Sequence, residues 1–557
     1  MTQDQSLVEY QLGMTLEAQD RLHDALAAYD RAIAADLGNA GAWNNRGNIL
    51  RRTERLEEAV ESLGHAVTLA PLHAAPLTNR GTILLMLNRH AEAATDFRRL
   101  LEMAPGDRNA PGGLLTAAQA LCDWDMVEAL LPRLGAAAAQ GLAIVPPMTL
   151  LFSFDAPQLL HDATAHFVRE QVKAPPAARP PLRPRAPKIR IAYLSADFQT
   201  HATAWLMADL IERHDRDRFE IIGVSWGADN GGPWRARLAK GFDHFIEASV
   251  MTDTQVAALL REMPVDIAID LKGATSFSRP GIFNSRAAPL QVNWLGYPGT
   301  MASEFHDYIL ADPVVLPHDQ QPFYDEQIVH LPDSYQPNDP TRPLATMTRA
   351  QAGLPATGFV FCCFNHYRKI TRATFALWLR LLAAMPGSVL WLLQDSASET
   401  LRQRAAAHGI DPARLVLAPF VAMEANLARL ACADLVLDTL PCGAHTTASD
   451  ALWAGAPIVT CLGNTFAGRV AASLLTAIGA PELIATTPQD YETIALTLAR
   501  DPARLAALKA KLAANRTTAP LFDAPRFCRH LERGYEMMLD HAQTGAPPRP
   551  FDVPVTR

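Results

Sequence analysis

The chain has 557 residues, of which 49% are hydrophobic and 19% charged, so it is long enough for two to four globular domains and too apolar to be disordered. Its net charge of -8 argues against a general nucleic-acid binder and against a protein of anionic membrane surfaces. The start of the chain has no signal-peptide pattern, and no run of 18 apolar residues predicts a membrane span. The 7 cysteines form no CxxC pair, which favours a reducing, cytoplasmic location.

Residues 1–107 contain an internal repeat with a period of 34 residues. The repeated positions hold Gly13, Gly47 and Gly81, then Ala25, Ala59 and Ala93, then Tyr29, Leu63 and Phe97. Small residues where paired helices cross, with a large apolar residue one turn later, predict three tetratricopeptide repeats. Such repeats stack into a superhelix, and we expect its groove to bind a protein or peptide, with Asn44, Asn45 and Asn79 available to the peptide backbone. A spacer or a surface for homodimer formation is the alternative.

Two segments follow the repeats. Residues 108–172 keep leucine and alanine at helical spacing, which predicts degenerate repeats or a helical cap. Residues 173–188 read KAPPAARPPLRPRAPK, and proline at this density predicts an extended linker and a domain boundary.

The remaining chain alternates between short apolar runs and amphipathic segments, first over 189–345 and again over 346–540, before a tail at 541–557. Each alternating block predicts a doubly wound, parallel α/β lobe. The predicted fold class is therefore α plus α/β, with a tetratricopeptide superhelix followed by two Rossmann-like lobes. Two such lobes are the architecture of GT-B type glycosyltransferases and also of other nucleotide enzymes. Neither GxGxxG after the first strand nor GxxxxGK[ST] occurs, which disfavours a dehydrogenase or a P-loop kinase.

Residues 431–475 predict a strand at 435–438, a helix that opens at Thr446 and Thr447 and closes at Gly455, a strand at 457–461, and a helix holding Arg469. A helix amino terminus at the carboxyl edge of a parallel sheet suits a diphosphate, with His445 just before it. Asp450 lies one turn further on and could accept hydrogen bonds from a ribose. A capped helix with a dipole-favouring aspartate fits the same spacing.

Three further features sit where predicted strands end. His201 opens a helix after the first strand of its lobe and could hold a proton near pH 7 or only cap the helix. Lys369, flanked by His366 and Arg368, could neutralise a leaving diphosphate or be a surface charge. The loop at 295–300 carries glycines that would let the backbone approach a ligand closely, or that form only an ordinary tight turn. No HExxH and no clustered carboxylate pair predicts a metal site.

Taken together, these features resemble the protein O-GlcNAc transferases of glycosyltransferase family 41, in a compact form like a bacterial homologue. The motifs that carry the resemblance are SADFQTHATAWLM, VNWLGYPGT, CCFNHYRKI, SVLWLLQ, LDTLPCGAHTTASDALWAGAPIVT and GRVAASLL. The resemblance implies inverting transfer of N-acetylglucosamine from UDP-GlcNAc to Ser or Thr of proteins, without a required metal or other cofactor.

The resemblance also implies roles for individual residues. His201 would act as base or as a sugar and acceptor contact, and Lys369 would bind the diphosphate. The implied nucleotide-sugar contacts are His445, Thr446 and Thr447 at the phosphates, Asp450 at the ribose, Arg429 beside the uridine, Leu295 and Gly296 against the sugar, and His366. The base could instead be a phosphate oxygen of the donor.

Some positions depart from the eukaryotic pattern. His366 replaces a glutamine, Met423 and Asn426 replace a lysine and a histidine that contact the nucleotide, and Asp266 replaces a histidine near the sugar. The insertion between the lobes is absent. Because other branches of the family use GDP-fucose or glucosylate asparagine, protein O-fucosyl or glucosyl transfer stays open, as does a noncatalytic scaffold that binds nucleotide.

Overall fold

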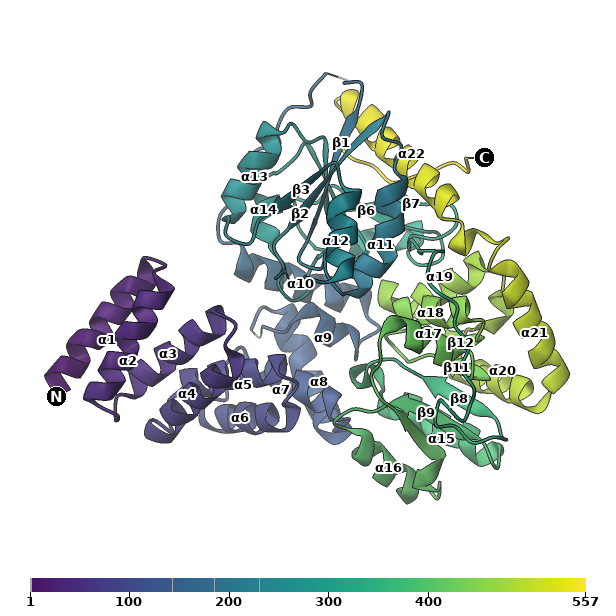
Figure 1. The fold of residues 1–557 in the computed structure, drawn as a ribbon, viewed down its shortest axis with the longest axis horizontal. Helices are drawn as coiled ribbons and strands as arrows, with labels where there is room; N and C mark the ends of the chain where they lie inside the picture. The colour runs from purple at the N-terminus through teal and green to yellow at the C-terminus, as the bar shows by residue number, and fades with distance from the viewer. Residues whose placement is uncertain (1–2, 143, 185, 230, 557) are drawn as a thin grey trace. The chain divides into compact units, whose positions relative to one another are not determined.

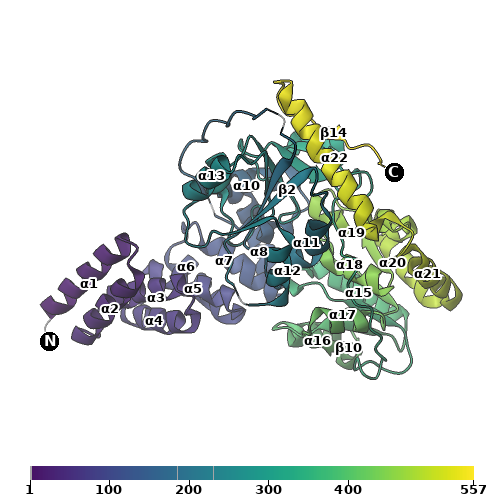
Figure 2. The same ribbon diagram turned by 45° about the horizontal axis from the view of Figure 1, so that its top comes forward.

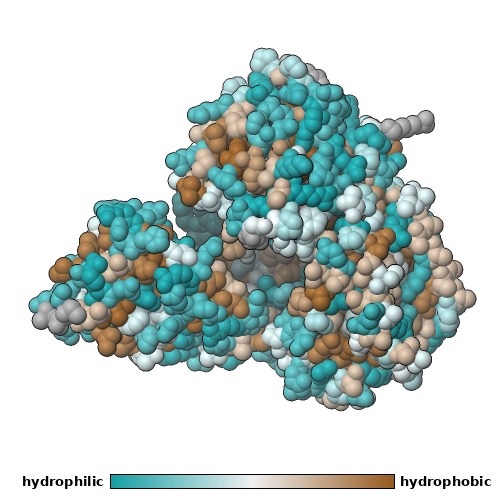
Figure 3. Space-filling model, in the orientation of Figure 1, coloured by the Kyte–Doolittle hydropathy of each residue, from teal (hydrophilic) through white to brown (hydrophobic). Residues whose placement is uncertain are grey.

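The computed structural model describes residues 3–142, 144–184, 186–229 and 231–556. The chain divides into two compact units, Met1–Val145 and Pro146–Arg557 (Figure 1). Among the described residues, no helix is long and apolar enough to cross a membrane. On the face drawn in Figure 3, hydrophilic residues predominate and hydrophobic ones lie scattered among them.

The first unit is a series of helices in which consecutive helices pack against each other (Figure 2). The helices are α1 (Gln3–Ala18), α2 (Leu22–Ala35), α3 (Ala40–Arg52), α4 (Leu56–Leu69), α5 (Ala74–Met86), α6 (His90–Met103), α7 (Ala110–Ala120) and α8 (Trp124–Ala139). The first three pairs are the three predicted repeats, and α7 with α8 continues the pattern without the full sequence signature. This confirms the predicted tetratricopeptide architecture.

The repeated glycines explain how the helices of each pair approach one another. A Cβ atom added to Gly13 would lie 2.5 Å from the Tyr29 ring, and one added to Gly81 would lie 2.8 Å from the Phe97 ring. A small residue in the first helix therefore makes room for a large apolar residue in the second. Asn79 donates to Asn44 at 3.1 Å, which links the first helices of two successive repeats.

The first lobe of the second unit is built on an eight-stranded parallel sheet in the order β14-β7-β6-β5-β4-β1-β2-β3. Its strands are β1 (Ile189–Ser195), β2 (Phe219–Ser225), β3 (His244–Glu247), β4 (Ile267–Asp270), β5 (Leu290–Asn293), β6 (Tyr308–Ala311), β7 (Gln327–His330) and β14 (Phe551–Asp552). Its helices are α9 (Pro147–Leu151), α10 (Pro157–Gln171), α11 (Ala202–Arg213), α12 (Pro233–Gly241), α13 (Asp253–Glu262), α14 (Pro280–Asn284) and the 3-10 helix η1 (His318–Phe323).

The second lobe has a six-stranded parallel sheet in the order β10-β9-β8-β11-β12-β13. Its strands are β8 (Val360–Cys363), β9 (Val389–Leu393), β10 (Leu415–Ala418), β11 (Leu435–Leu437), β12 (Ile458–Cys461) and β13 (Ile484–Ala485). Its helices are η2 (Tyr367–Lys369), α15 (Arg372–Ala384), α16 (Ser398–Ala407), η3 (Pro412–Arg414), α17 (Met423–Leu430), α18 (Thr446–Ala454), η4 (Phe466–Gly468), α19 (Val470–Ala477), η5 (Pro481–Leu483), α20 (Pro488–Arg500), α21 (Pro502–Asn515) and η6 (Pro520–Phe522).

The central strands β4, β5, β6, β8, β9, β11 and β12 are buried along their whole length, as expected for parallel strands covered by helices. The strand and helix alternation predicted for both lobes is therefore confirmed, and so is the predicted fold class. Parallel pairing brings the carboxyl ends of all strands of one sheet to one edge, and the loops at these edges carry the candidate site residues.

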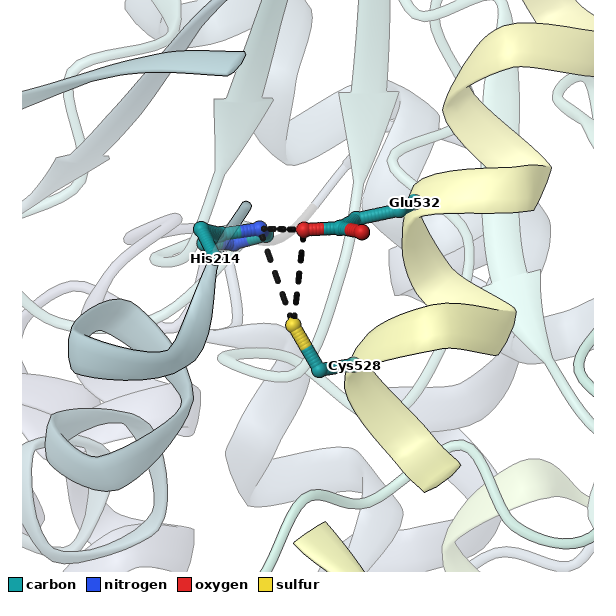
Figure 4. Close-up of side chains that lie close together, drawn as sticks. All are labelled: His214, Cys528 and Glu532. Carbon is teal, nitrogen blue, oxygen red and sulfur yellow. Dashed lines mark hydrogen bonds and ion pairs between the residues drawn. The ribbon is translucent and has the colours of Figure 1, made fainter. Parts of the chain in front are cut away.

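The C-terminal end of the chain returns to the first lobe. Helix α22 (Ala524–Gln543) packs against α11, and β14 then pairs with β7 at the edge of the first sheet. His214, at the end of α11, donates to Glu532 of α22 at 3.0 Å, and Cys528 lies beside both (Figure 4). The two lobes are therefore joined twice along the chain, once near residue 345 and once through α22.

The proline-rich segment 173–188 holds no helix or strand among its described residues and lies inside the second unit. Arg183 in this segment makes two hydrogen bonds to Asp266, at the start of β4. The segment therefore runs along the first lobe and is held to it by an ion pair.

Candidate active site

The amino terminus of helix α18 lies at the carboxyl edge of the second sheet and has no side-chain cap. The loop before this helix is held by Asp438, which comes directly after β11 and is fully buried. The carboxylate accepts from the backbone N–H of Thr439 at 2.7 Å and of Ala444 at 2.6 Å. Asp438 therefore fixes the loop that leads into α18, and the uncapped first amides of this helix are suited to donate to an anion.

Lys369 lies beside this helix terminus. It ends the 3-10 helix η2 after β8, and its Nζ donates to the Gly443 carbonyl at 2.6 Å. Asn365, just before, accepts from the Thr447 hydroxyl at 2.6 Å and donates to Thr439 at 2.9 Å. The loops after β8 and β11 are thereby tied together, and a lysine ammonium and a helix amino terminus lie side by side.

His445 precedes the helix and is electrically neutral. Its Nε2 lies 3.1 Å from the Ala467 carbonyl and can donate to it. Burial and the neighbouring Lys369 charge lower the pKa of His445 to about 3, and the hydrogen bond to Ala467 opposes this effect. The positive charge that faces the loop therefore comes from Lys369 and the helix amides, and His445 adds a polar contact without charge. His366 is exposed and accepts from the Arg368 amide at 3.2 Å.

Asp450 is buried one turn into α18 and has a partner. Arg342, from the segment that joins the two sheets, donates to its Oδ1 at 2.7 Å. Burial raises the pKa of Asp450, and the Arg342 charge opposes this rise. Arg342 therefore favours the ionised carboxylate, and its hydrogen bond to Oδ1 holds the side chain in place. A small cavity beside Asp450 reaches Thr447 and Asn426.

Arg429 lies on α17 above the same sheet edge. Its guanidinium lies 4.4 Å from the ring centre of Phe364, and it donates to Asn426 and to the Pro419 carbonyl. Burial lowers the pKa of Arg429. The arginine thus holds the α17 end of the cavity in place.

The first lobe places His201 at the carboxyl edge of its own sheet. His201 caps α11, and its Nδ1 accepts from the Thr203 amide at 3.2 Å. A buried ion pair lies next to it, with Lys272 Nζ 2.8 Å from Asp197 Oδ2. Burial and the Lys272 charge lower the pKa of His201, and Asp197 opposes this effect.

The loop after β5 is shaped by contacts inside the protein. A Cβ atom at Gly296 would lie 2.0 Å from the carbonyl oxygen of Leu271, so the glycine is required by a backbone neighbour. This contact is the one expected of an ordinary tight turn, and the role of the loop against a sugar stays a prediction. Leu295 has a φ of 68°, a left-handed value that is costly for leucine. The same loop shares a small cavity with Thr465 and Phe466 of the second lobe, so the carboxyl edges of the two sheets meet here.

Two expectations need correction. Asp266 precedes β4 and is paired with Arg183, so it lies at the amino edge of the sheet and not near a sugar site at the carboxyl edge. Arg469 stands just before α19 rather than within it, and it donates to the Val314 carbonyl of the first lobe at 2.8 Å.

Sequence reasoning missed Asp438, Asn365, Arg342 and Lys272. Asp438 is the last residue of the strand predicted at 435–438, and Asn365 lies just after β8; the carboxyl end of a strand is a position that could have marked both. Arg342 and Lys272 carry no local signal, because their partners lie 108 and 75 residues away along the chain. The structure groups Lys369, His445, Thr446, Thr447, Asp450 and Arg429 around one edge of the second sheet. His201, Leu295 and Gly296 lie at the edge of the first.

Comparison with known proteins agrees with this geometry. The family model described as glycosyl transferase family 41 matches residues 172–347 and 337–531, and a tetratricopeptide repeat model matches residues 38–105. A solved structure of a mutant O-GlcNAc transferase from Thermobaculum terrenum is 26% identical and superposes with a TM-score of 0.72, covering 98% of this chain and 99% of that one.

Curated relatives are longer than this chain. A probable UDP-N-acetylglucosamine–peptide N-acetylglucosaminyltransferase of Arabidopsis thaliana is 35% identical over 376 residues, which are 66% of this chain and 38% of the relative. The corresponding enzyme of Caenorhabditis elegans is 28% identical over 476 residues, with 65% of this chain and 41% of the relative covered. The chain thus spans about two fifths of the length of these relatives. Because the family model covers most of its second unit, the chain belongs to glycosyltransferase family 41.

Proposed function

We propose that this protein is an inverting glycosyltransferase that moves N-acetylglucosamine from UDP-GlcNAc to Ser or Thr hydroxyls of proteins. The observation that carries the proposal is the uncapped amino terminus of α18 beside the Lys369 ammonium. A diphosphate is the ligand that fits an ammonium group and a set of free helix amides at one sheet edge. Family membership and the names of the relatives supply the sugar.

In the proposed reaction, an acceptor hydroxyl attacks the anomeric carbon while the bond from that carbon to the diphosphate oxygen breaks. Negative charge grows on the departing UDP. Lys369 and the amides of Thr446 and Thr447 meet that charge, and they are held in place before the reaction by Asp438 and Asn365. Asp450 would receive the ribose hydroxyls, and Arg429 would border the base. No metal is part of the proposal.

The geometry of His201 bears on which group takes the proton. A neutral imidazole has one N–H, and Nδ1 of His201 accepts from the Thr203 amide, so its proton is on Nε2. In this form the exposed nitrogen donates a hydrogen bond and cannot act as a base. We therefore infer that His201 orients the sugar or the acceptor, and that a phosphate oxygen of the donor takes the hydroxyl proton.

We also propose that the repeat unit binds the acceptor protein. The Asn44 and Asn79 pair supports this, because amide side chains can hydrogen-bond a peptide backbone without regard to its sequence. A cytoplasmic site of action is consistent with the 7 cysteines, which are all buried and free.

Transfer of radiolabelled N-acetylglucosamine to proteins of a cell lysate tests the proposal. GDP-fucose and UDP-glucose are run in parallel, because Met423 and Asn426 depart from the nucleotide contacts of the eukaryotic enzymes. The proposal expects label from UDP-GlcNAc, with loss of label in Lys369→Ala. If only another sugar nucleotide gives labelled protein, that nucleotide is the donor and the assignment of UDP-GlcNAc is wrong. Nucleotide binding without any transfer would support a noncatalytic scaffold instead.

A further inference from the structure

Two histidines and an aspartate meet at the carboxyl edge of the first sheet, outside the candidate active site. His330 is the last residue of β7, and Asp552 is the last residue of β14 and pairs with it in register. His318 opens η1, in the connection that precedes β7. Three different segments of the chain therefore bring a possible ligand to one point.

The three side chains converge on a single oxygen atom. Asp552 Oδ1 lies 2.9 Å from His318 Nε2 and 2.8 Å from His330 Nδ1. The two imidazole rings are stacked with their centres 3.9 Å apart. A carboxylate oxygen approached by two ring nitrogens can accept an N–H from each ring, or it can share a bound cation with them.

The second nitrogen of His330 is fixed by the backbone. His330 Nε2 lies 2.7 Å from the Leu316 carbonyl, and a carbonyl can only accept, so Nε2 carries a proton. His330 Nδ1 faces the carboxylate oxygen at 2.8 Å, where either a second proton or a bound cation can join the two atoms. A backbone carbonyl behind the ring is also the usual partner that orients a metal-binding histidine.

We propose that His318 Nε2, His330 Nδ1 and Asp552 form a binding site for a zinc ion. Imidazole nitrogen and carboxylate oxygen are ligands that suit Zn²⁺, and the ligand atoms all lie within 4.8 Å of one another. A tetrahedral ion would hold them about 3.3 Å apart. The exposed side chains of His318 and Asp552 can make the small movement that this spacing requires, and water can fill the open position.

The site explains how the end of the chain is held. Strand β14 has only two residues. Just after it, the Val553 amide donates to the His330 carbonyl of β7 at 2.9 Å. So short a strand is weakly held by its ladder alone. A zinc ion shared by β7, η1 and β14 would fasten the tail to the first lobe.

A second trio of possible ligands serves as the comparison. His214, Cys528 and Glu532 lie within 4.8 Å of one another and are buried (Figure 4). There, His214 Nδ1 donates to Glu532 at 3.0 Å, and Nε2 accepts from the Tyr193 hydroxyl at 2.9 Å. Each nitrogen of His214 already has a complementary partner, so this cluster needs no ion.

The test uses the full-length, tag-free protein after treatment with EDTA. Zinc chloride is titrated by calorimetry, and Co²⁺ is followed by its visible absorption as a spectroscopic probe of coordination. The variants are His318→Ala and Asp552→Asn, which change exposed side chains and should leave the fold intact. The controls are His408→Ala, an exposed histidine of the second lobe, and Cys528→Ser in the comparison cluster.

We expect one zinc ion per chain, bound at least about tenfold more weakly by either variant and unchanged in both controls. Zinc should also raise the melting temperature of the parent protein and not that of His318→Ala. The proposal fails if no saturable binding is seen, or if both variants bind zinc like the parent. It also fails if Cys528→Ser abolishes binding, because zinc would then occupy the buried cluster.

Discussion

The buried pair of Arg342 and Asp450 offers a sharp test, because it separates the stability of the second unit from its affinity for nucleotide. Asp450→Ala removes the proposed ribose contact and also leaves Arg342 buried without its partner, since Arg342 is only 4% exposed. Arg342→Met removes the partner and keeps the carboxylate. The double variant Arg342→Met/Asp450→Leu replaces both charges with apolar groups of similar size.

The expected magnitudes differ between these variants. Breaking a buried ion pair by removing one partner costs about 3–5 kcal/mol, whereas replacing both partners is often close to neutral. At about 2.1 cal/mol/K per residue, that cost lowers the melting temperature of the second unit, Pro146–Arg557, by about 3–6 °C. A hydrogen bond to a charged group contributes about 1.5–3 kcal/mol, so losing the ribose contact should weaken UDP binding roughly 10- to 150-fold.

The assays are thermal unfolding and calorimetric titration with UDP. Both single variants should have a lower melting temperature than the parent, and the double variant should recover most of the difference. In the UDP titration, only the two variants that lack the Asp450 carboxylate should lose all of the affinity that the ribose contact provides. Arg342→Met should bind UDP more weakly at low pH, because without Arg342 the buried carboxyl has a raised pKa and takes up a proton as pH falls. UDP affinity within twofold of the parent in Asp450→Ala would refute the ribose assignment.

Three further predictions concern single residues. Lys369→Ala should lower the rate of sugar transfer by about 10²–10³, and near-normal initial rates would show that the lysine does not meet the leaving group. His201→Gln keeps a hydrogen-bond donor and should retain much of the activity. If His201 were instead the base, kcat/KM of the parent would fall as the pH drops through the pKa of His201, and His201→Gln would not show this fall. Burial lowers that pKa below 6.5. Gly296→Ala should reduce thermal stability sharply because its Cβ would meet the Leu271 carbonyl, whereas Gly106→Ala, with nothing within 4 Å, should be tolerated.

Local signals predicted much of the fold correctly. Thr446 and Thr447 do open a helix, and Gly455 does close it in a left-handed conformation with a φ of 81°. The 34-residue period located the repeat helices because each unit carries the same small and large residues at its crossing. These features depend on neighbours within one or two turns, so they can be read from a short stretch of chain.

Contacts between distant segments could not be predicted in this way. Strand β14 carries no strand pattern of its own and forms because β7 offers an unpaired edge. The Lys272 and Asp197 pair joins the ends of β4 and β1, which become neighbours only through the strand order. Asp266 occupies the motif position of a histidine near the sugar, but a motif does not show at which end of a strand a residue lies.

The most direct test is a crystal structure of the protein with UDP bound. The account predicts the β-phosphate within hydrogen-bonding distance of Lys369 Nζ and the amides of Thr446 and Thr447, with the ribose against Asp450. A diphosphate bound elsewhere, with Lys369 still donating only to the Gly443 carbonyl, would contradict it.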